Sequence, residues 1–309
     1  MCSESREFPS SRTDDVTKRY FSRDTLRKSA ECYLRIARGA EPLLLDAPAK
    51  VAPRYGYGKP AHPLLYQLID QNRKAYRATL ESFLTSEKAL AGIPVRRVAN
   101  AGGPYWDNGW FEGIDAAALF CLLGSIRPRR YLEVGSGFST AFAARAKADF
   151  HLRTEITSID PSPRIMIDEV CDRVIRRRLE EMDLSIFEEL EEGDFLLVDS
   201  SHFCYMNSDV ATFFFDVLPR LEQGIMVHFH DIFLPYDYPP EMADRYYSEQ
   251  YLLGTYLLAT AGRIDIVLPN SFVMRDLELS SIARALLMRA TPTKATMIGG
   301  SFWIRTGAV

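Results

Sequence analysis

The fold is decided by the stretch Tyr131-Leu132-Glu133-Val134-Gly135-Ser136-Gly137-Phe138-Ser139-Thr140. Tyr131–Val134 is a short, mostly apolar run that predicts a buried strand, and Gly135 and Gly137 predict a tight turn that opens a helix. Glycine lets the backbone pass close to a ligand where a β-carbon would clash, and the amide groups at the start of a helix favour an electron-rich ligand group. This stretch therefore predicts the strand–turn–helix unit of a ligand-binding α/β domain.

An acidic residue at the end of the next predicted strand supports this interpretation. The strand is Glu155–Ile159, and Asp160 follows it directly. An acid in this place accepts hydrogen bonds from ribose hydroxyls. Thr140 stands where a dinucleotide-binding turn carries its third glycine, and Glu133 would repel a pyrophosphate but attract the cationic amino-acid end of S-adenosylmethionine. These two details favour S-adenosylmethionine over a nicotinamide cofactor.

The chain alternates strands and helices from residue 105 onward. Further strands are expected over 195–198, 224–229, 264–268 and 301–305, and helices over 113–125, 139–148, 163–177, 208–221, 243–261 and 278–289. Arg173–Leu179, where a third strand is due, is too basic to read as a clear buried strand. The alternation predicts a mostly parallel sheet with helices on both faces.

The N-terminal third is expected to be helical. Helices are predicted over 15–38 and 63–90, with a proline-rich loop between them. We therefore expect a doubly wound, Rossmann-like α/β domain over residues 105–309, preceded by a tail and helical extension over residues 1–104. The extension would cap the ligand pocket or form the contact of a homodimer.

Composition argues against several other classes of protein. The chain has 309 residues, 47% of them hydrophobic, and a formal net charge of −4. This balance supports a sizeable core and gives no reason to expect a nucleic-acid or membrane partner. Five widely spaced cysteines form no CxxC pair, and the polar N-terminus lacks the apolar core of a signal peptide. We expect free thiols and a cytoplasmic location.

Several stretches together resemble the class I S-adenosylmethionine-dependent methyltransferases. The run 133–140 resembles their motif I, in the GxGxST form of a bacterial group called methyltransferase domain family 24, and Ile159-Asp160-Pro161-Ser162 resembles motif II. The run 195–202 is similar to that group's DxxH strand end, with Ser200 where glycine is commoner. Residues 228–232 and 299–305 resemble its fifth and last strands. The resemblance covers residues 105–305 and implies a seven-stranded sheet that binds S-adenosylmethionine.

The resemblance also implies roles for single residues. The methionyl part of the cofactor would be surrounded by Glu133, Gly135, Ser136, Gly137, Ser139 and Thr140. Asp160 would bind the ribose, with Pro161 and Ser162 beside it, and Asp199 would also lie at the cofactor. The adenine would lie against residues 181–184.

His202, His228 and His230 follow two predicted strands, where α/β sheets bind ligands. In one interpretation His202 or His230, beside Asp199, is the general base that removes a proton from a substrate hydroxyl. In another, Asp199, His230 and Asp231 hold a divalent metal ion, an arrangement similar to that of the metal-dependent catechol and macrolide-sugar O-methyltransferases. A histidine among the ligands favours manganese, iron or zinc over magnesium. In a third, the histidines only shape the loops.

Two aromatic segments are candidates for the walls of the site. Residues 105–113 would form a lid over the cofactor, with Glu112 near its amino group, or an aromatic plug beneath the extension. Residues 233–240 would line the substrate pocket or form a rigid crossover loop. Residues 245–256 are expected to be a helix that packs on the sheet.

The expected reaction is methyl transfer from S-adenosylmethionine to an oxygen of a small molecule or sugar. The alternatives on the same scaffold are a metal-dependent hydroxylase or other oxidoreductase, and a non-catalytic module that binds the cofactor. The acceptor is set by variable loops and does not follow from the motifs.

Overall fold

The computed structural model describes residues 50–98, 103–260, 262–291 and 299–307 and, within 29–37, all residues except 31 and 35. The chain forms two compact units, Met1–Lys50 and Val51–Val309. In the first unit the described residues between 29 and 37 are helical. The rest of the helix predicted over 15–38 lies outside the described residues. Across the described residues, no helix combines the length and the apolar character that a membrane span requires.

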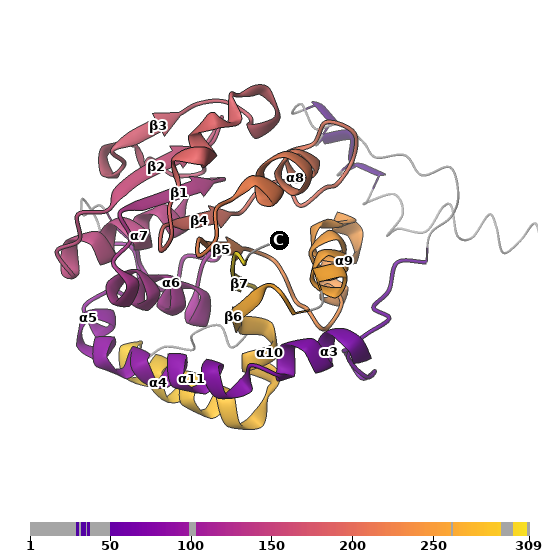
Figure 1. Ribbon diagram of the computed structural model, residues 1–309, viewed down its shortest axis with the longest axis horizontal. Coiled ribbons are helices and arrows are strands. Elements are labelled where there is room, and N and C mark those ends of the chain that lie inside the picture. Colours follow the sequence, from indigo (N-terminus) through magenta and orange to yellow (C-terminus); the bar gives the residue numbers. More distant parts are fainter. Residues whose placement is uncertain are drawn as a thin grey trace, which may run out of the picture. The chain divides into compact units, whose positions relative to one another are not determined.

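The second unit is built on a seven-stranded sheet in the order β3-β2-β1-β4-β5-β7-β6 (Figure 1). The strands are β1 (Arg130–Val134), β2 (Glu155–Ile159), β3 (Arg173–Ile175), β4 (Phe195–Val198), β5 (Met226–Phe229), β6 (Asp265–Pro269) and β7 (Phe302–Arg305). The first five strands are parallel, and β7 is antiparallel to both of its neighbours. The central strand β4 is buried over its whole length, as expected for a strand covered on both faces.

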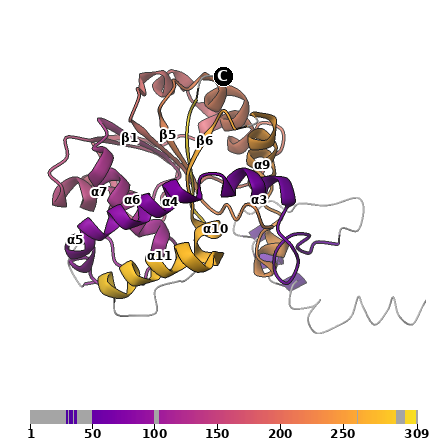
Figure 2. The same cartoon turned by 60° about the horizontal axis from the view of Figure 1, so that its bottom comes forward.

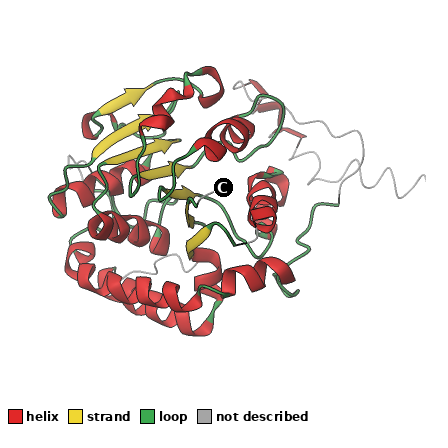
Figure 3. Cartoon of the chain, viewed as in Figure 1, coloured by secondary structure: helices red, strands yellow, loops and turns green. Residues whose placement is uncertain are grey.

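Helices cover both faces of this sheet. They are α3 (Pro63–Asp70), α4 (Arg73–Ser82), α5 (Glu87–Ala91), α6 (Gly113–Ile126), α7 (Phe138–Asp149), α8 (Asp209–Thr212), α9 (Glu249–Thr260), α10 (Asn270–Arg275) and α11 (Leu277–Ala290). Figures 1 and 2 show α6 and α7 on one side of the sheet and α9 on the other, and Figure 3 shows how completely helices enclose the strands. The doubly wound, Rossmann-like prediction is confirmed. α4 and α5 pack on α11, and α3 packs on α9; the division of roles at residue 104 stays a prediction.

The prediction of one long helix over 63–90 is wrong. The helix breaks after Asp70 and resumes at Arg73. At the break, Asn72 donates its side-chain amide to the Ile266 carbonyl at 3.1 Å and to the Asp265 carboxylate at 3.2 Å. These long-range bonds to β6 fix the chain where a continuous helix would carry Asn72 past the sheet.

The prediction of a helix over 163–177 is also wrong. Asp168–Val170 is a single 3₁₀ turn, and β3 follows it. β3 pairs with β2 at the edge of the sheet and leaves Arg173 exposed, so it accommodates arginines that a central strand would exclude. The helix predicted over 243–261 starts only at Glu249. α10 has no counterpart among the sequence-based predictions.

Candidate active site

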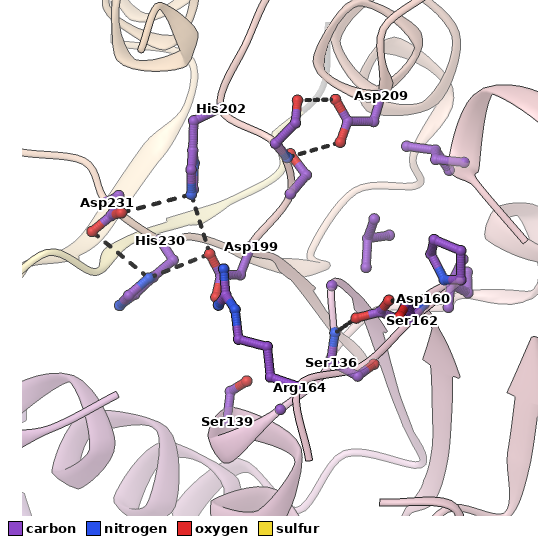
Figure 4. Close-up of a pocket in the computed structure, with 18 of the residues that line it drawn as sticks. Ser136, Ser139, Asp160, Ser162, Arg164, Asp199, His202, Asp209, His230 and Asp231 are labelled. Atoms are coloured by element: carbon purple, nitrogen blue, oxygen red, sulfur yellow. Dashed lines mark hydrogen bonds and ion pairs between the residues drawn. The ribbon is translucent and has the colours of Figure 1, made fainter. Parts of the chain in front are cut away.

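A cavity of about 610 Å³ opens at the carboxyl edge of the parallel strands. Its walls come from the residues that follow four strands: Gly135–Ser139 after β1, Asp160–Ser162 after β2, Asp199–His202 after β4, and His230 and Asp231 after β5. Figure 4 shows these side chains converging on one space. Open α/β sheets bind their ligands at this edge, where the strand order reverses between β1 and β4.

The glycine turn after β1 needs its two glycines for different reasons. Gly135 has a φ of +83°, and a β-carbon there would lie 1.8 Å from the Asp199 carbonyl oxygen. Only glycine lets this turn pass so close to the end of β4. Gly137 is extended, with a φ of 178°, and a β-carbon there would meet nothing within 4 Å. The space beside Gly137 is therefore cavity.

Glu133 lies behind the turn. Its fully buried carboxyl accepts hydrogen bonds from the hydroxyls of Ser139 and Thr140, the latter at 2.6 Å. Thr140 Oγ1 in turn accepts the Gly137 amide at 3.0 Å. Burial raises the pKa of Glu133 to about 8, although these hydroxyls counteract it. Glu133 and Thr140 do not line the cavity. They stabilise the turn from behind, whereas the sequence suggested that they contact the cofactor directly.

Asp160 lines the cavity and also holds the turn in place. One carboxylate oxygen accepts the Ser136 amide and the other accepts the Ser162 amide, both at 2.7 Å. Each oxygen keeps a further lone pair, which is available to hydroxyls of a ligand. Pro161 and Ser162 line the wall beside it. At this end the wall continues through residues 177–180, so residues 181–184, expected at the adenine, lie just beyond it.

Two histidines flank Asp199 at the other end of the cavity. Asp199 Oδ1 lies 3.3 Å from His202 Nε2 and 3.4 Å from His230 Nδ1. Asp231 lies 3.6 Å from His202 Nε2 and 3.9 Å from His230 Nδ1. His202 and Asp231 have φ values of 64° and 54°. Non-glycine residues held in this left-handed region concentrate at functional sites.

Two further acids belong to this cluster, and no motif around them in the sequence indicates that they do. Glu249 is fully buried at the start of α9, and its Oε2 lies 2.8 Å from His202 Nδ1. Asp115, in the first turn of α6, lies 3.9 Å from His230 Nε2 and accepts the Gly300 amide at 2.8 Å. Both acids reach the histidines only because α6 and α9 begin at this edge of the sheet.

The carboxylates decide the charge of both imidazoles. Burial disfavours the protonated ring of His230, but Asp199, with Asp231 and Asp115, raises its pKa to about 9. Burial acts likewise on His202, yet Asp199 and Glu249 raise its pKa well above the usual value. Burial raises the pKa of Asp199, but His230 and His202 outweigh it and hold this pKa well below the ordinary value. The carboxylates therefore favour the charged form of both imidazoles.

His228 does not belong to the site. It is fully buried, and neither ring nitrogen has a hydrogen-bond partner among the described residues. Burial, with the neighbouring His230, lowers its pKa well below the usual value. Its ring centroid lies 4.5 Å from that of Trp303 on β7. His228 is a neutral core residue, so only two of the three strand-end histidines face the cavity.

The expected metal set of Asp199, His230 and Asp231 is not supported. Each aspartate lies between 3.4 and 3.9 Å from an imidazole nitrogen, an arrangement in which carboxylates and imidazoles form ion pairs with one another. Among the described residues, no group of three or more histidine, cysteine, aspartate or glutamate side chains is placed to hold a metal ion.

The aromatic segment 105–113 contributes both to the cavity wall and to the core, while its role as a lid over the cofactor stays a prediction. Gly109, Trp110 and Phe111 line the cavity. Trp106 and Phe111 are buried against Phe142, with ring centroids 5.6 and 6.2 Å away. The segment thus forms part of the cavity wall on one side and part of the hydrophobic core on the other.

The segment 233–240 lies outside the cavity wall. Asp237 instead accepts the amide of Tyr55 at 2.9 Å and the hydroxyl of Tyr251 at 3.1 Å, which supports the crossover-loop interpretation. The wall is completed by Met242, Arg245 and Tyr247, which precede α9. The prediction that Arg245 and Tyr247 belong to a helix packed on the sheet is therefore wrong.

Known proteins resemble this chain over its central part. Residues 132–232 match the family model Methyltransf_24, described as a methyltransferase domain. An uncharacterized protein from Archaeoglobus fulgidus is 37% identical over 95 residues, which cover 29% of this chain and 43% of that protein. The match thus spans less than half of that curated relative.

Two methyltransferases are among the solved structures that match this chain. The O-methyltransferase from Bacillus cereus in complex with SAH has a TM-score of 0.36 and 17% identity, covering 74% of this chain and 90% of that one. SAH-bound methyltransferase PaMTH1 from Podospora anserina has a TM-score of 0.41 and 16% identity, covering 86% and 100%. Residues 132–232 thus match a methyltransferase domain, and they include the first five strands of the sheet except the first residues of β1.

Proposed function

We propose that this protein transfers a methyl group from S-adenosylmethionine to a hydroxyl oxygen of a small molecule, with sugars among the candidates. One observation carries the proposal. A single cavity joins the glycine turn and Asp160 at one end to the cluster of Asp199, His202 and His230 at the other. Methyl transfer needs a donor and an acceptor held in line, and a shared cavity supplies this positioning.

The end of the cavity at Asp160 suits the cofactor. Its two oxygens, already anchored by backbone amides, are placed to accept ribose hydroxyls. The open space beside Gly137 and the hydroxyl of Ser139 are left for the methionyl part. When bound, S-adenosylmethionine supplies the methyl group on a positively charged sulfur.

The other end suits deprotonation of the acceptor. Glu249 holds His202 Nδ1 at 2.8 Å, so Nε2, which lies 3.3 Å from Asp199, is the nitrogen that would receive the hydroxyl proton. His230 keeps Asp199 ionised, and the carboxylate stabilises His202 once it is protonated. Because the pKa of His202 is raised, the fraction of the neutral ring that acts as a base increases as pH rises.

Neither alternative function has an observation of its own in its favour. A hydroxylase or oxidoreductase on this scaffold would need the metal set at Asp199, His230 and Asp231, whose carboxylates face imidazole nitrogens instead. A non-catalytic cofactor-binding module would not need Glu249 buried against His202.

The proposal is tested by separating cofactor binding from turnover. We expect wild-type protein to bind S-adenosylmethionine and to methylate a member of a hydroxyl-bearing panel. His202→Gln should bind the cofactor normally but lose turnover. His151→Asn, at an exposed histidine outside the cavity, should retain both. Full turnover by His202→Gln would contradict the role of His202, and no binding of S-adenosylmethionine by wild type would contradict the proposed function.

A further inference from the structure

We infer that the methyl acceptor carries an anionic group, a carboxylate or a phosphate, and that Arg245 binds it. This inference rests on the proposed function and names the chemical class of its substrate. Four arginines line the cavity: Arg164, Arg177, Arg178 and Arg245. The guanidinium stays charged at any physiological pH and pairs with two oxygens of a carboxylate or phosphate at once.

The acids of the cavity are already engaged within the protein. Asp160 accepts two backbone amides, and Asp199 and Asp231 face the two imidazoles. Asp209 accepts the amide and the hydroxyl of Ser201 at 2.8 and 2.5 Å. Figure 4 shows each of these four aspartates joined by dashed lines to its partner. The remaining acid of the cavity wall, Glu180, lies 3.8 Å from Arg178, so each of these acids has a partner other than Arg245.

Arg245 is held by an aromatic side chain in place of a carboxylate. Its Nη1 donates to the Tyr247 hydroxyl at 3.2 Å, and its Cζ lies 5.5 Å from the centroid of the Tyr247 ring. These are its interactions among the described residues. A tyrosine orients a guanidinium without cancelling its charge, so Arg245 remains available to an anion from the cavity.

The position of Arg245 assigns it to the acceptor. His202 also contacts Tyr247, with ring centroids 4.6 Å apart, so the proposed base and the Arg245 guanidinium neighbour the same tyrosine. Arg164 lies elsewhere: it stacks at 4.2 Å on Trp110 and is four residues beyond Asp160. Arg164 is the better match for the cofactor's own carboxylate.

The cavity wall also includes the apolar or aromatic side chains of Met242, Tyr205 and Tyr247. A compact acceptor with a hydroxyl near His202 and an anionic group near Arg245 would therefore lay its carbon skeleton against these side chains. Such an acceptor would bind through one charged anchor and one reacting hydroxyl.

The test uses two matched pairs of probes, titrated calorimetrically into protein saturated with S-adenosylhomocysteine. The pairs are 4-hydroxybenzoate with 4-hydroxybenzamide, and glucose 6-phosphate with glucose. We expect one anion to bind about tenfold or more tightly than its neutral partner, as charge-assisted bonds to arginine allow. The pair that shows this preference distinguishes a carboxylate from a phosphate.

Three variants locate the effect. Arg245→Met should abolish the preference for the anion, Arg245→Lys should keep part of it, and Arg284→Met, at an exposed arginine on α11 outside the cavity, should leave it unchanged. Three results would each overturn the inference. The first is equal affinity for the anion and its neutral partner, and the second is binding of neither anion at millimolar concentration. The third is a preference that is lost in Arg164→Met but retained in Arg245→Met. Binding of S-adenosylhomocysteine is measured first; its absence contradicts the proposed function alone, and the anions are then titrated into ligand-free protein.

Discussion

The two glycines of the turn after β1 should fail in different ways when each is replaced by alanine. At Gly135 the φ of +83° costs alanine about 1–2 kcal/mol. The new β-carbon would also lie 1.8 Å from the backbone oxygen of Asp199, and relieving such an overlap costs a further ~1–3 kcal/mol. For a domain of this size each kcal/mol lowers Tm by roughly 2–4 °C, so Gly135→Ala should lower it by on the order of 10 °C.

At Gly137 the same substitution has no such cost. The backbone is extended and the added β-carbon meets no protein atom within 4 Å. Gly137→Ala should therefore keep the wild-type Tm. If the methionyl part of the cofactor occupies this space, the methyl group displaces it, and affinity for S-adenosylmethionine should fall about tenfold, or about 1.4 kcal/mol.

Thermal unfolding followed by circular dichroism and calorimetric titration of S-adenosylmethionine separate the two effects. The reasoning predicts a folding defect in Gly135→Ala and a pure binding defect in Gly137→Ala. Wild-type affinity in Gly137→Ala would refute the claim that the cofactor passes this glycine. A wild-type Tm in Gly135→Ala would refute the close approach of the turn to β4.

Three other predictions follow from the charges of the site. Asp160→Ala should weaken binding of S-adenosylmethionine by about tenfold or more, whereas Asp160→Asn should lose less, because it keeps one acceptor oxygen for the amides that Asp160 now holds; equal losses by calorimetry would contradict this. The turnover of wild type should rise with pH, because the pKa of the proposed base His202 is raised above its usual value; Glu249→Gln should move this rise to lower pH and reduce the maximal rate by about 10²-fold, and an unmoved profile would show that Glu249 does not act on His202. The pKa of Glu133 is raised to about 8 in the folded protein, so its contribution to stability is complete below the pKa of the unfolded chain and is lost as pH rises through 8. The Tm of wild type should therefore fall relative to that of Glu133→Gln between pH 5 and pH 8. A parallel pH dependence of the two Tm values would argue against a buried, protonated Glu133.

The parts of the site that follow directly after a strand were predictable from the sequence. The turn at Gly135 and Gly137 and the acid Asp160 follow strands β1 and β2 directly, and strand-end residues of a parallel sheet meet at one edge. His202 and His230 were predictable for the same reason. What the pattern could not tell was that His228 would face Trp303 and thus the core.

The remaining residues depend on tertiary packing. Glu249 reaches His202 because α9 begins beside the loop after β4, where the Ser248 amide bonds the His202 carbonyl at 2.9 Å. Arg245 lines the cavity because that helix starts later than its apolar pattern suggests. Glu133 was expected at the cofactor for its charge, yet the hydroxyls of Ser139 and Thr140 hold it behind the turn. Strand β3 was not predicted because it lies at the edge of the sheet, where a strand does not need to be apolar.

The central claim is that the cavity at Gly135–Ser139 and Asp160 binds S-adenosylmethionine. Calorimetric titration of the purified, EDTA-treated protein with S-adenosylmethionine, and separately with NAD, tests it most directly. The account predicts micromolar affinity for S-adenosylmethionine and no binding of NAD, because Thr140 replaces the third glycine of a dinucleotide turn and is buried against Glu133. Binding of NAD, or no binding of S-adenosylmethionine, would contradict it.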